Sequence, residues 1–586
     1  MRLFWRSETS WSPSFEGRSI ERALPKNSLA VPVRLAVAGI LALLALTVGT
    51  QTAMAAPTPK APKGLKAFLL RVNEPESLNN RSFPRTPAFA WKPVAGAKKY
   101  EFELSTSEKF AEGALIWSSQ SSAVKLTSPA ATVPISLPWM TGNPYALYAR
   151  VRGISPKGHE GRWSAPYGFN MRWRDRPRPL DPQFPGMVRW TPIEGATMYQ
   201  VWFEGSTVSF FTTTNVADER EFYAFHTQPW WIQSVNWRIR AVRKVYGDIP
   251  TGMPCVTYGA WSDWFTNINP PFTVDFNPPY NQTPAEIALT GTVAGDVVST
   301  PSSPQAHELL PAFRWTGNYR SWGSPGFLDT TTELFRVYVY TDSECVNRVY
   351  TGAMVGGPAY APRLGQTLAY PGTFANINAA RNEWPKYGAE GTSVMWDGTP
   401  VAAADSASTG IHLWDTYWPS GGYYWTVVPV YARPDPVDGS KIMEYRDIQL
   451  PEDVCRAGGA ARFGKVSKPV LVGDKAPYAS GLSPAGKLVP ATRTIPAFYG
   501  APLVAWEPIL GAHEYEVQWS RKLNPWRTEP TPLKTGATPA VLPLTVGRWY
   551  YRVRGLNYML PAKPEMTWSK AIGVKIAKPR FKIVKR

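Results

Sequence analysis

Few residues of this 586-residue chain have the types and spacing that catalysis or metal binding requires. Its five histidines are isolated from one another, and His307-Glu308 is not followed by a second histidine at helical spacing, so the zinc-protease motif is absent. A G-x-S-x-G nucleophile turn, a phosphate-binding loop, an EF-hand loop and a C-x-x-C pair are also missing. We therefore expect no catalytic residue, no metal ligand and no cofactor. Because glycosidase carboxylates come from distant strands, a secreted carbohydrate-active enzyme is the alternative.

Residue types that bind without catalysing are more abundant, above all tryptophan, tyrosine and arginine. A segment at about 341–411 is rich in Gly, Ala, Thr and Pro, and aromatic residues lie within it and directly after it. Aromatic rings in a long loop can stack on sugar rings while a neighbouring aspartate accepts hydroxyl hydrogen bonds. The alternative is that the rings pack the segment onto the domain beneath it. The candidate ligand-binding residues are Trp384, Trp396, Trp414, Tyr417 and Trp418.

A repeated pattern indicates the elements that carry other aromatic residues. Three segments share the order Trp, Pro, Gly-Ala and Tyr, with Trp and Tyr nine residues apart, and a weaker fourth copy keeps the tryptophan. Pro and Gly supply turn dihedrals, so each copy predicts a strand, a turn and a second strand that alternates about the tyrosine. We expect these aromatic side chains to fill domain cores: Trp91 with Tyr100, Trp190 with Tyr199, Trp506 with Tyr515, and Trp315 in the fourth copy.

Each complete copy has a second half, a predicted strand with two arginines on one face and Val or Ile on the other, followed by a Trp-Ser turn. Guanidinium planes can stack on the indole rings and cover them. Recurrence in copy after copy favours such a structural ladder, and an anion-binding strip is the functional alternative. The residues are Arg150, Arg152 and Trp163; Arg238, Arg240, Trp261 and Trp264; and Arg552, Arg554 and Trp568.

Together these motifs resemble the fibronectin type III domain, with Trp on strand B, Tyr on strand C, a Y-x-V-R strand F and a W-S turn opening strand G. Another immunoglobulin-like sandwich is the alternative. The resemblance implies an all-β protein of tandem immunoglobulin-like (fibronectin type III) β-sandwiches, each with seven strands in two antiparallel sheets. The 58 prolines agree, because proline disfavours long helices. The expected modules are 62–174, 175–272, 280–472 with the insertion at about 341–411, and 476–578, followed by a basic tail at 579–586.

The first 55 residues are expected to be a removable segment. A basic region precedes an uncharged apolar run at 35–49, and the triplet Ala53-Met54-Ala55 follows it. These features are typical of a secretory signal peptide, here residues 1–55, that is cut after Ala55. An uncleaved anchor helix is the alternative, because the stretch is long enough to span a bilayer. We expect a secreted or extracellular protein, associated with the cell envelope, that does not span the membrane after signal removal.

The charge balance points to partners of one kind. The chain has a net charge of +19, and the part after residue 55 keeps +16. This favours anionic or glycan extracellular polymers, such as wall polymers and acidic glycans. No nucleic-acid module is present, so nucleic acid is not expected as a partner, and we expect a monomer. We expect a non-catalytic extracellular binding or adhesion protein, and an architectural spacer without its own ligand is the alternative.

The resemblance also bears on the three cysteines. It places Cys345 after strand C of the third module and Cys455 between strands F and G, and in this fold these strands share a sheet. The two loops can then reach the Cα separation of about 4.4–6.8 Å that a disulfide needs. Export favours oxidation, and an odd count leaves one thiol over, so we expect a Cys345–Cys455 disulfide with Cys255 unpaired. Three buried thiols are the alternative.

Overall fold

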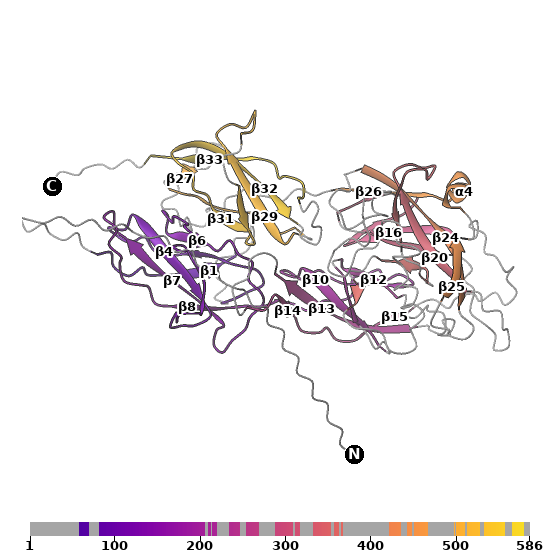
Figure 1. The fold of residues 1–586 in the computed structure, drawn as a ribbon, viewed down its shortest axis with the longest axis horizontal. Helices are drawn as coiled ribbons and strands as arrows, with labels where there is room; N and C mark the ends of the chain where they lie inside the picture. Colours follow the sequence, from indigo (N-terminus) through magenta and orange to yellow (C-terminus); the bar gives the residue numbers. More distant parts are fainter. Residues whose placement is uncertain are drawn as a thin grey trace, which may run out of the picture. The chain divides into compact units, whose positions relative to one another are not determined.

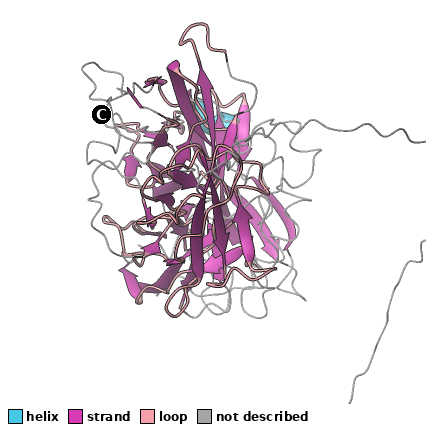
Figure 2. Cartoon of the chain, turned by 90° about the vertical axis from the view of Figure 1, so that its left-hand side faces the viewer, coloured by secondary structure: helices cyan, strands magenta, loops and turns pink. Residues whose placement is uncertain are grey.

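The computed structural model divides the chain into two units, Met1–Ala55 and Ala56–Arg586, and all the residues described belong to the second. The structure describes residues 58–69, 81–204, 209–212, 214–219, 234–245, 253–268, 287–308, 311–316, 332–352, 355, 357–361, 365–366, 421–434, 442–447, 450–466, 497–498, 500–509, 512–527, 532–556 and 565–578. Strands dominate this part of the chain, and its helix, α4 (Pro451–Arg456), is one short element (Figures 1 and 2). The chain is therefore an all-β protein.

Residues 66–171 form two sheets that face each other across a core. One has the order β1 (Lys66–Phe68), β3 (Ala88–Ala90) and β6 (Ala130–Thr132). The other has the order β2 (Ser82–Phe83), β8 (Tyr167–Met171), β7 (Leu147–Ile154), β4 (Lys99–Ser105) and β5 (Leu115–Ser118). Burial alternates along β7, and Phe89 of the first sheet lies 4.8 Å from Phe102 of the second, measured between ring centroids. This is a β-sandwich.

Residues 187–268 follow a similar plan. A small sheet pairs β9 (Met187–Arg189) with β12 (Val216–Asp218). A larger sheet has the order β14 (Val256–Tyr258), β13 (Ser234–Lys244), β10 (Met198–Phe203), β11 (Ser209–Thr212) and β23 (Gly365–Gln366), and β15 (Phe265–Ile268) also pairs with β13. β23 comes from far along the chain and extends the sheet by pairing with β11.

Residues 288–465 form the third pair of sheets. The first has the order β17 (Val297–Ser299), β16 (Ala288–Ala294), β19 (Ala312–Thr316) and β22 (Ala359–Tyr360). The second has the order β18 (Ala306–His307), β26 (Ala461–Lys465), β24 (Gly421–Pro434), β20 (Thr332–Tyr340) and β21 (Arg348–Thr351), with β25 (Ile442–Asp447) paired to β24. β21, β22 and β23 all lie inside the range expected as an insertion, so that range contributes strands to these sheets.

Residues 497–576 repeat the plan of residues 66–171. A small sheet pairs β28 (Leu503–Ala505) with β31 (Pro539–Val541). The larger sheet has the order β27 (Ala497–Phe498), β33 (Ile572–Ile576), β32 (Gly547–Leu556), β29 (Glu514–Ser520) and β30 (Leu533–Thr535). As with β2 and β8, the short β27 runs parallel to the last strand of its group. The strand plan thus recurs, while the module boundaries expected from the sequence remain predictions.

The aromatic pairs of the repeat explain its fixed spacing. Trp91, Trp190 and Trp506 are at most 4% exposed, and each makes an edge contact with its tyrosine at 5.2–5.5 Å between ring centroids. The hydroxyl of each tyrosine accepts a hydrogen bond from a backbone N–H in the turn, three residues after the tryptophan: Val94 N to Tyr100, Ile193 N to Tyr199 and Ile509 N to Tyr515. The tyrosine therefore satisfies a turn donor and packs the core at once.

The fourth tryptophan uses a different partner. Trp315 is 1% exposed and packs against Phe335 of β20 at 5.8 Å between ring centroids.

The turn glycines of the first two copies, Gly96 and Gly195, have φ values of 78° and 83°, which explains why glycine occupies that position.

The first and last groups of strands share a core. Phe68, Ala88 and Ala90 belong to the same buried cluster as Trp506 and its neighbours. Two hydrogen bonds accompany this packing, from Ser128 Oγ to the Ala501 carbonyl at 2.9 Å and from Gly536 N to the Pro134 carbonyl at 2.9 Å.

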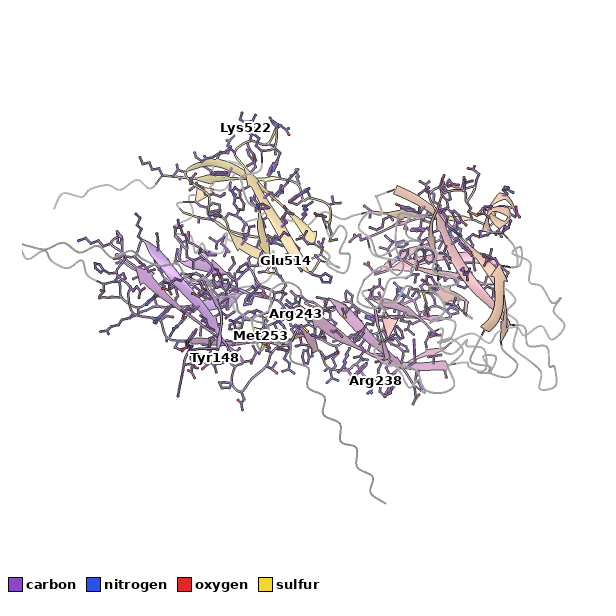
Figure 3. The ribbon with its side chains drawn as sticks, in the orientation of Figure 1. Tyr148, Arg238, Arg243, Met253, Glu514 and Lys522 are labelled. Atoms are coloured by element: carbon purple, nitrogen blue, oxygen red, sulfur yellow. A yellow bond between two sulfur atoms is a disulfide. The ribbon has the colours of Figure 1, made fainter. Side chains whose placement is uncertain are left out.

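A buried arginine joins the first two groups. Arg243 of β13, which is labelled in Figure 3, donates to the carbonyl oxygens of Leu137 and Gly195 at 2.6 and 2.8 Å, and to Ser136 Oγ at 2.8 Å. Burial lowers the pKa of Arg243 to about 10, so the guanidinium keeps its charge at neutral pH. Hydrogen bonds to fixed carbonyl dipoles offset the cost of burying that charge.

We expect the buried His307 to make residues 288–465 sensitive to acid. Its side chain is fully buried, Nε2 lies 2.7 Å from Thr292 Oγ1, and burial lowers the pKa of His307 to about 4. Below the unfolded pKa of about 6.5, the unfolded chain binds a proton that the folded chain does not, so the free energy of unfolding falls as pH drops towards 4. When the pH has fallen below the pKa of His307 in the folded chain, the total decrease in the free energy of unfolding is about 3 kcal/mol. Melting curves from pH 7 to 4 should show a smaller decline for His307→Gln, and an equal decline would contradict this prediction.

Candidate binding face

Two arginines of β7 stack on a tryptophan and also pair with carboxylates. Arg150 and Arg152 place their guanidinium carbons 4.2 and 4.5 Å from the ring centroid of Trp163. Directly across the β4–β7 ladder, Glu103 pairs with Arg150 and Glu101 with Arg152, each at 2.6 Å. Burial raises the pKa of Glu101, although the hydrogen bond and charge of Arg152 oppose that shift. Glu160 also pairs with Arg152 at 2.5 Å, so three carboxylates compensate the two guanidinium charges of this face.

On the matching face of β32, the two carboxylates Glu516 and Glu565 both pair with Arg554, the second at 3.7 Å. Arg552 stacks between Trp526 and Trp568 at 4.4 and 4.3 Å, and Arg554 stacks on Trp568 at 4.5 Å. Glu516 lies opposite Arg554 and pairs with it at 2.6 Å. Opposite Arg552 stands a neutral residue, Gln518, which accepts a hydrogen bond at 2.9 Å.

The third face, on β13, has no carboxylate at either position. Trp202 lies opposite Arg238, and Gln200 lies opposite Arg240 and accepts its hydrogen bond at 2.7 Å. Within the described residues, neither arginine forms an ion pair, and Arg238 Nε has no hydrogen-bond partner. Burial lowers the pKa of Arg240, and the neighbouring Tyr258 opposes the shift. Among the described residues, two guanidinium charges are therefore left without a carboxylate opposite them on this face; Arg238 is labelled in Figure 3.

Aromatic rings surround both of these charges. Arg238 lies 4.2 Å from the ring centroid of Trp202 and 4.8 Å from those of Trp261 and Trp264. Arg240 lies 4.0 Å from Tyr258 and 4.6 Å from Trp261. We call this set the arginine strip: Trp202, Arg238, Arg240, Tyr258, Trp261 and Trp264.

The outer rings of the arginine strip face solvent. Trp264 is 44% exposed and Tyr258 is 40% exposed, whereas Trp163 and Trp568 of the other faces are half-buried. Guanidinium groups bind carboxylate, sulfate and phosphate, and an exposed indole offers an apolar face to a sugar ring. Positive charge and open aromatic surface thus occur together here.

Serine residues hold each Trp-Ser turn against its strand, a role that sequence reasoning missed. Ser164, Ser262 and Ser569 are buried, and their hydroxyls accept hydrogen bonds from the backbone N–H of Val151, Ile239 and Val553 at 2.9–3.1 Å. Each hydroxyl also donates to the carbonyl of the residue that follows it. The serine after each tryptophan was the available signal, because short hydroxyl side chains favour such local backbone bonds.

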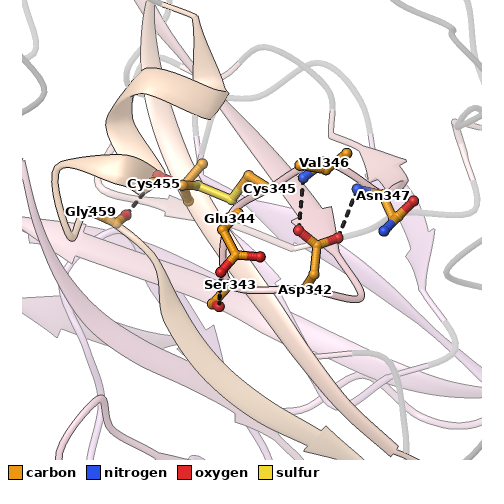
Figure 4. Close-up of a disulfide and its surroundings, with 9 residues drawn as sticks. Asp342, Ser343, Glu344, Cys345, Val346, Asn347, Cys455 and Gly459 are labelled. Atoms are coloured by element: carbon orange, nitrogen blue, oxygen red, sulfur yellow. Dashed lines mark hydrogen bonds between the residues drawn. A yellow bond between two sulfur atoms is a disulfide. The ribbon is translucent and has the colours of Figure 1, made fainter.

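Two of the cysteines join the loop after β20 to helix α4. Cys345 and Cys455 form a disulfide with their Cα atoms 6.0 Å apart (Figure 4), and Cys255 is free and exposed. Beside Cys345, Asp342 accepts hydrogen bonds from Val346 N and Asn347 N at 2.8 and 2.7 Å. Partial burial opposes the change, but these bonds lower the pKa of Asp342.

Some expected site residues fall outside the part of the chain that the structure describes. They are the aromatic candidates Trp384, Trp396, Trp414, Tyr417 and Trp418. Among the described residues, no group of three or more His, Cys, Asp and Glu could hold a metal ion. In the same residues, no helix is long and apolar enough to cross a membrane.

Comparisons with known proteins add little to this geometry. No family model matches the chain, and no curated protein matches it. Among solved structures, the FN1–FN3 domains of chicken CNTN1 are 10% identical, with 70% of this chain and 99% of that chain covered and a TM-score of 0.13. An α-L-rhamnosidase from Dictyoglumus thermophilum is 10% identical, with 48% and 40% covered and a TM-score of 0.15. At these TM-scores neither likeness carries an argument, and the class stated here, an all-β protein of sandwiched sheets, rests on the chain's own strands.

Proposed function

We propose that the chain is an exported, non-catalytic binding protein that attaches to anionic or glycan polymers outside the cell through the arginine strip. The observation that carries this proposal is the pair of guanidinium groups on β13 that has exposed aromatic rings beside it and no carboxylate opposite it. The net charge of +16 after residue 55 adds a long-range attraction to such polymers.

The difference between faces supports a binding role for one of them. On β4, Glu101 and Glu103 lie opposite the two ladder arginines and form ion pairs with them. On β10 the corresponding residues are Gln200 and Trp202, which leave both charges in place. Partly buried charge without a counter-charge lowers stability, and the anionic groups of a ligand would supply that counter-charge.

An array of extracellular polymers tests the proposal. The protein from Ala56 to Arg586 should be retained by acidic polymers at low salt and released as salt rises, because screening weakens such contacts. Neutral glycans of the same length should retain it less. If no polymer retains the protein, the result favours an architectural spacer. If the protein degrades any of the polymers, the result favours a carbohydrate-active enzyme.

Export makes a separate prediction about the chain's start. We expect the intact mass of the protein recovered outside the cell to correspond to a chain that begins at Ala56, because the A-x-A triplet ends at Ala55. A recovered chain that still contains residues 35–49 would contradict the proposed secretion and indicate a membrane anchor instead.

A further inference from the structure

A second basic surface lies next to the arginine strip. Residues 172–179 line a hollow of about 580 Å³, together with Ala260, Asp263 and Phe265. Arginine occupies every second position of this segment, at Arg172, Arg174, Arg176 and Arg178, and all four are exposed. A hollow of this size falls in the range that holds a small ligand or a short piece of a polymer.

Arginine is the most frequent residue among those that line the hollow. Its two carboxylates are Asp175, which lies 3.2 Å from Arg178, and Asp263, which lies 3.8 Å from Arg176. The four side chains in these pairs are 57–89% exposed, so the pairs are screened by water and easily exchanged for a ligand's oxygens. Among the described residues that line the hollow, four are thus arginines, and Asp175 and Asp263 pair with two of them.

Both ends of the arginine segment are anchored, so its side chains start from a fixed backbone. At one end, Trp173 packs on Trp139 at 5.6 Å between ring centroids. At the other end, Arg178 N donates to Thr191 Oγ1 at 3.1 Å, and Thr191 N donates to the Arg178 carbonyl at 2.8 Å. Pro177 lies between these anchors, is buried, and restricts the backbone further. Such preorganisation reduces the entropy lost when a ligand binds.

The hollow and the arginine strip share one turn. Trp261 and Trp264 stack on Arg238, while Ala260 and Asp263 of the same turn line the hollow. Residues 260–265 therefore contribute side chains to both surfaces. The two surfaces together present six arginines beside exposed aromatic rings.

We propose that the hollow and the arginine strip form one continuous site for a linear acidic polysaccharide. Repeated carboxylate or sulfate groups would pair with the guanidinium groups, and sugar rings would stack on Tyr258 and Trp264. This inference rests on the proposed function, and it adds that the ligand is an acidic sugar chain long enough to occupy both surfaces.

Oligogalacturonates of two lengths test this inference by calorimetry at low salt, with the protein from Ala56 to Arg586. The variant Arg174→Gln/Arg176→Gln/Arg178→Gln should weaken binding of the dodecamer about tenfold, since three exposed charge contacts are lost. The affinity of this variant for the trimer, which is short enough to bind to the arginine strip alone, should be unchanged. The control Lys109→Gln/Lys125→Gln/Lys157→Gln removes three exposed charges elsewhere and should bind both oligomers as the wild type does.

The outcomes separate this inference from the proposed function. If the triple arginine variant binds the dodecamer as tightly as the wild type, the hollow is not part of the site, although the strip can still bind the trimer. If the lysine control loses as much affinity as the arginine variant, only net charge matters and the continuous site is overturned. If polyphosphate binds more tightly than the dodecamer, the ligand is not an acidic sugar. If the wild type binds none of these polymers, the proposed function fails as well.

Discussion

Replacing Trp190 by alanine is expected to lower the free energy of unfolding of residues 187–268 by about 3–5 kcal/mol. The side chain is fully buried and packs on Tyr199 at 5.5 Å and on Trp237 at 6.1 Å between ring centroids. Alanine would leave a cavity between the sheets, because both neighbouring rings are held by strands. Thermal or denaturant unfolding of the variant measures the loss.

Trp264→Ala is the matched control for this prediction, since it removes the same side chain from the surface of the same group of strands. With 44% of Trp264 exposed, its loss should change stability by no more than about 1 kcal/mol. A Trp190→Ala protein that melts like the wild type would show that Trp190 does not lie in a core, and the strand assignment would be wrong.

Removing the disulfide is expected to have the second largest effect. Cys345 and Cys455 are separated by 110 residues, and both are buried. On the chain-entropy account, closing a loop of this length stabilises the folded state by roughly 4–5 kcal/mol, and native disulfides typically contribute about 2–5 kcal/mol. The variant Cys345→Ala/Cys455→Ala should therefore unfold residues 288–465 at clearly lower denaturant concentration.

Cys255→Ala supplies the comparison, because Cys255 is free and exposed. Its stability should stay within about 0.5 kcal/mol of the wild type. Peptide mapping under non-reducing conditions should find Cys345 linked to Cys455. A linked pair that includes Cys255 would contradict the arrangement of α4 and the loop after β20.

The core residues were predictable because their signal is local. Tryptophan, turn and tyrosine lie within ten residues of one another, and the hydrogen bond from the turn to the tyrosine hydroxyl fixes their spacing. The position of Cys345 and Cys455 also followed, because strand order within a sandwich determines which loops meet. Both inferences needed only the order of strands within one group.

Pairing between distant segments was not predictable in the same way. β23 lies in the Gly- and Ala-rich range that was expected to be an insertion. A strand of two residues is too short to show a hydrophobic periodicity, so its pairing with β11 could not be predicted. The contact of Ser128 with Ala501 joins residues that no repeat relates.

The arginine strip could be predicted from the sequence only in part. Its arginines and tryptophans were visible in the sequence, and so was the change from Glu101 and Glu103 to Gln200 and Trp202. That change acquires a meaning only with the strand register, which sets each residue opposite an arginine. The alternating arginines of residues 172–178 are also visible in the sequence, but only the structure shows that they line one hollow.

Titration of the protein from Ala56 to Arg586 with polygalacturonate tests the central claim most directly. We expect Arg238→Gln/Arg240→Gln to bind at least about tenfold more weakly than the wild type, because two charge-assisted contacts are lost. The charge control Lys109→Gln/Lys125→Gln should keep wild-type affinity, and both variants should melt within a few degrees of the wild type. If the strip variant binds as tightly as the wild type, the arginine strip is a structural ladder and not a binding site.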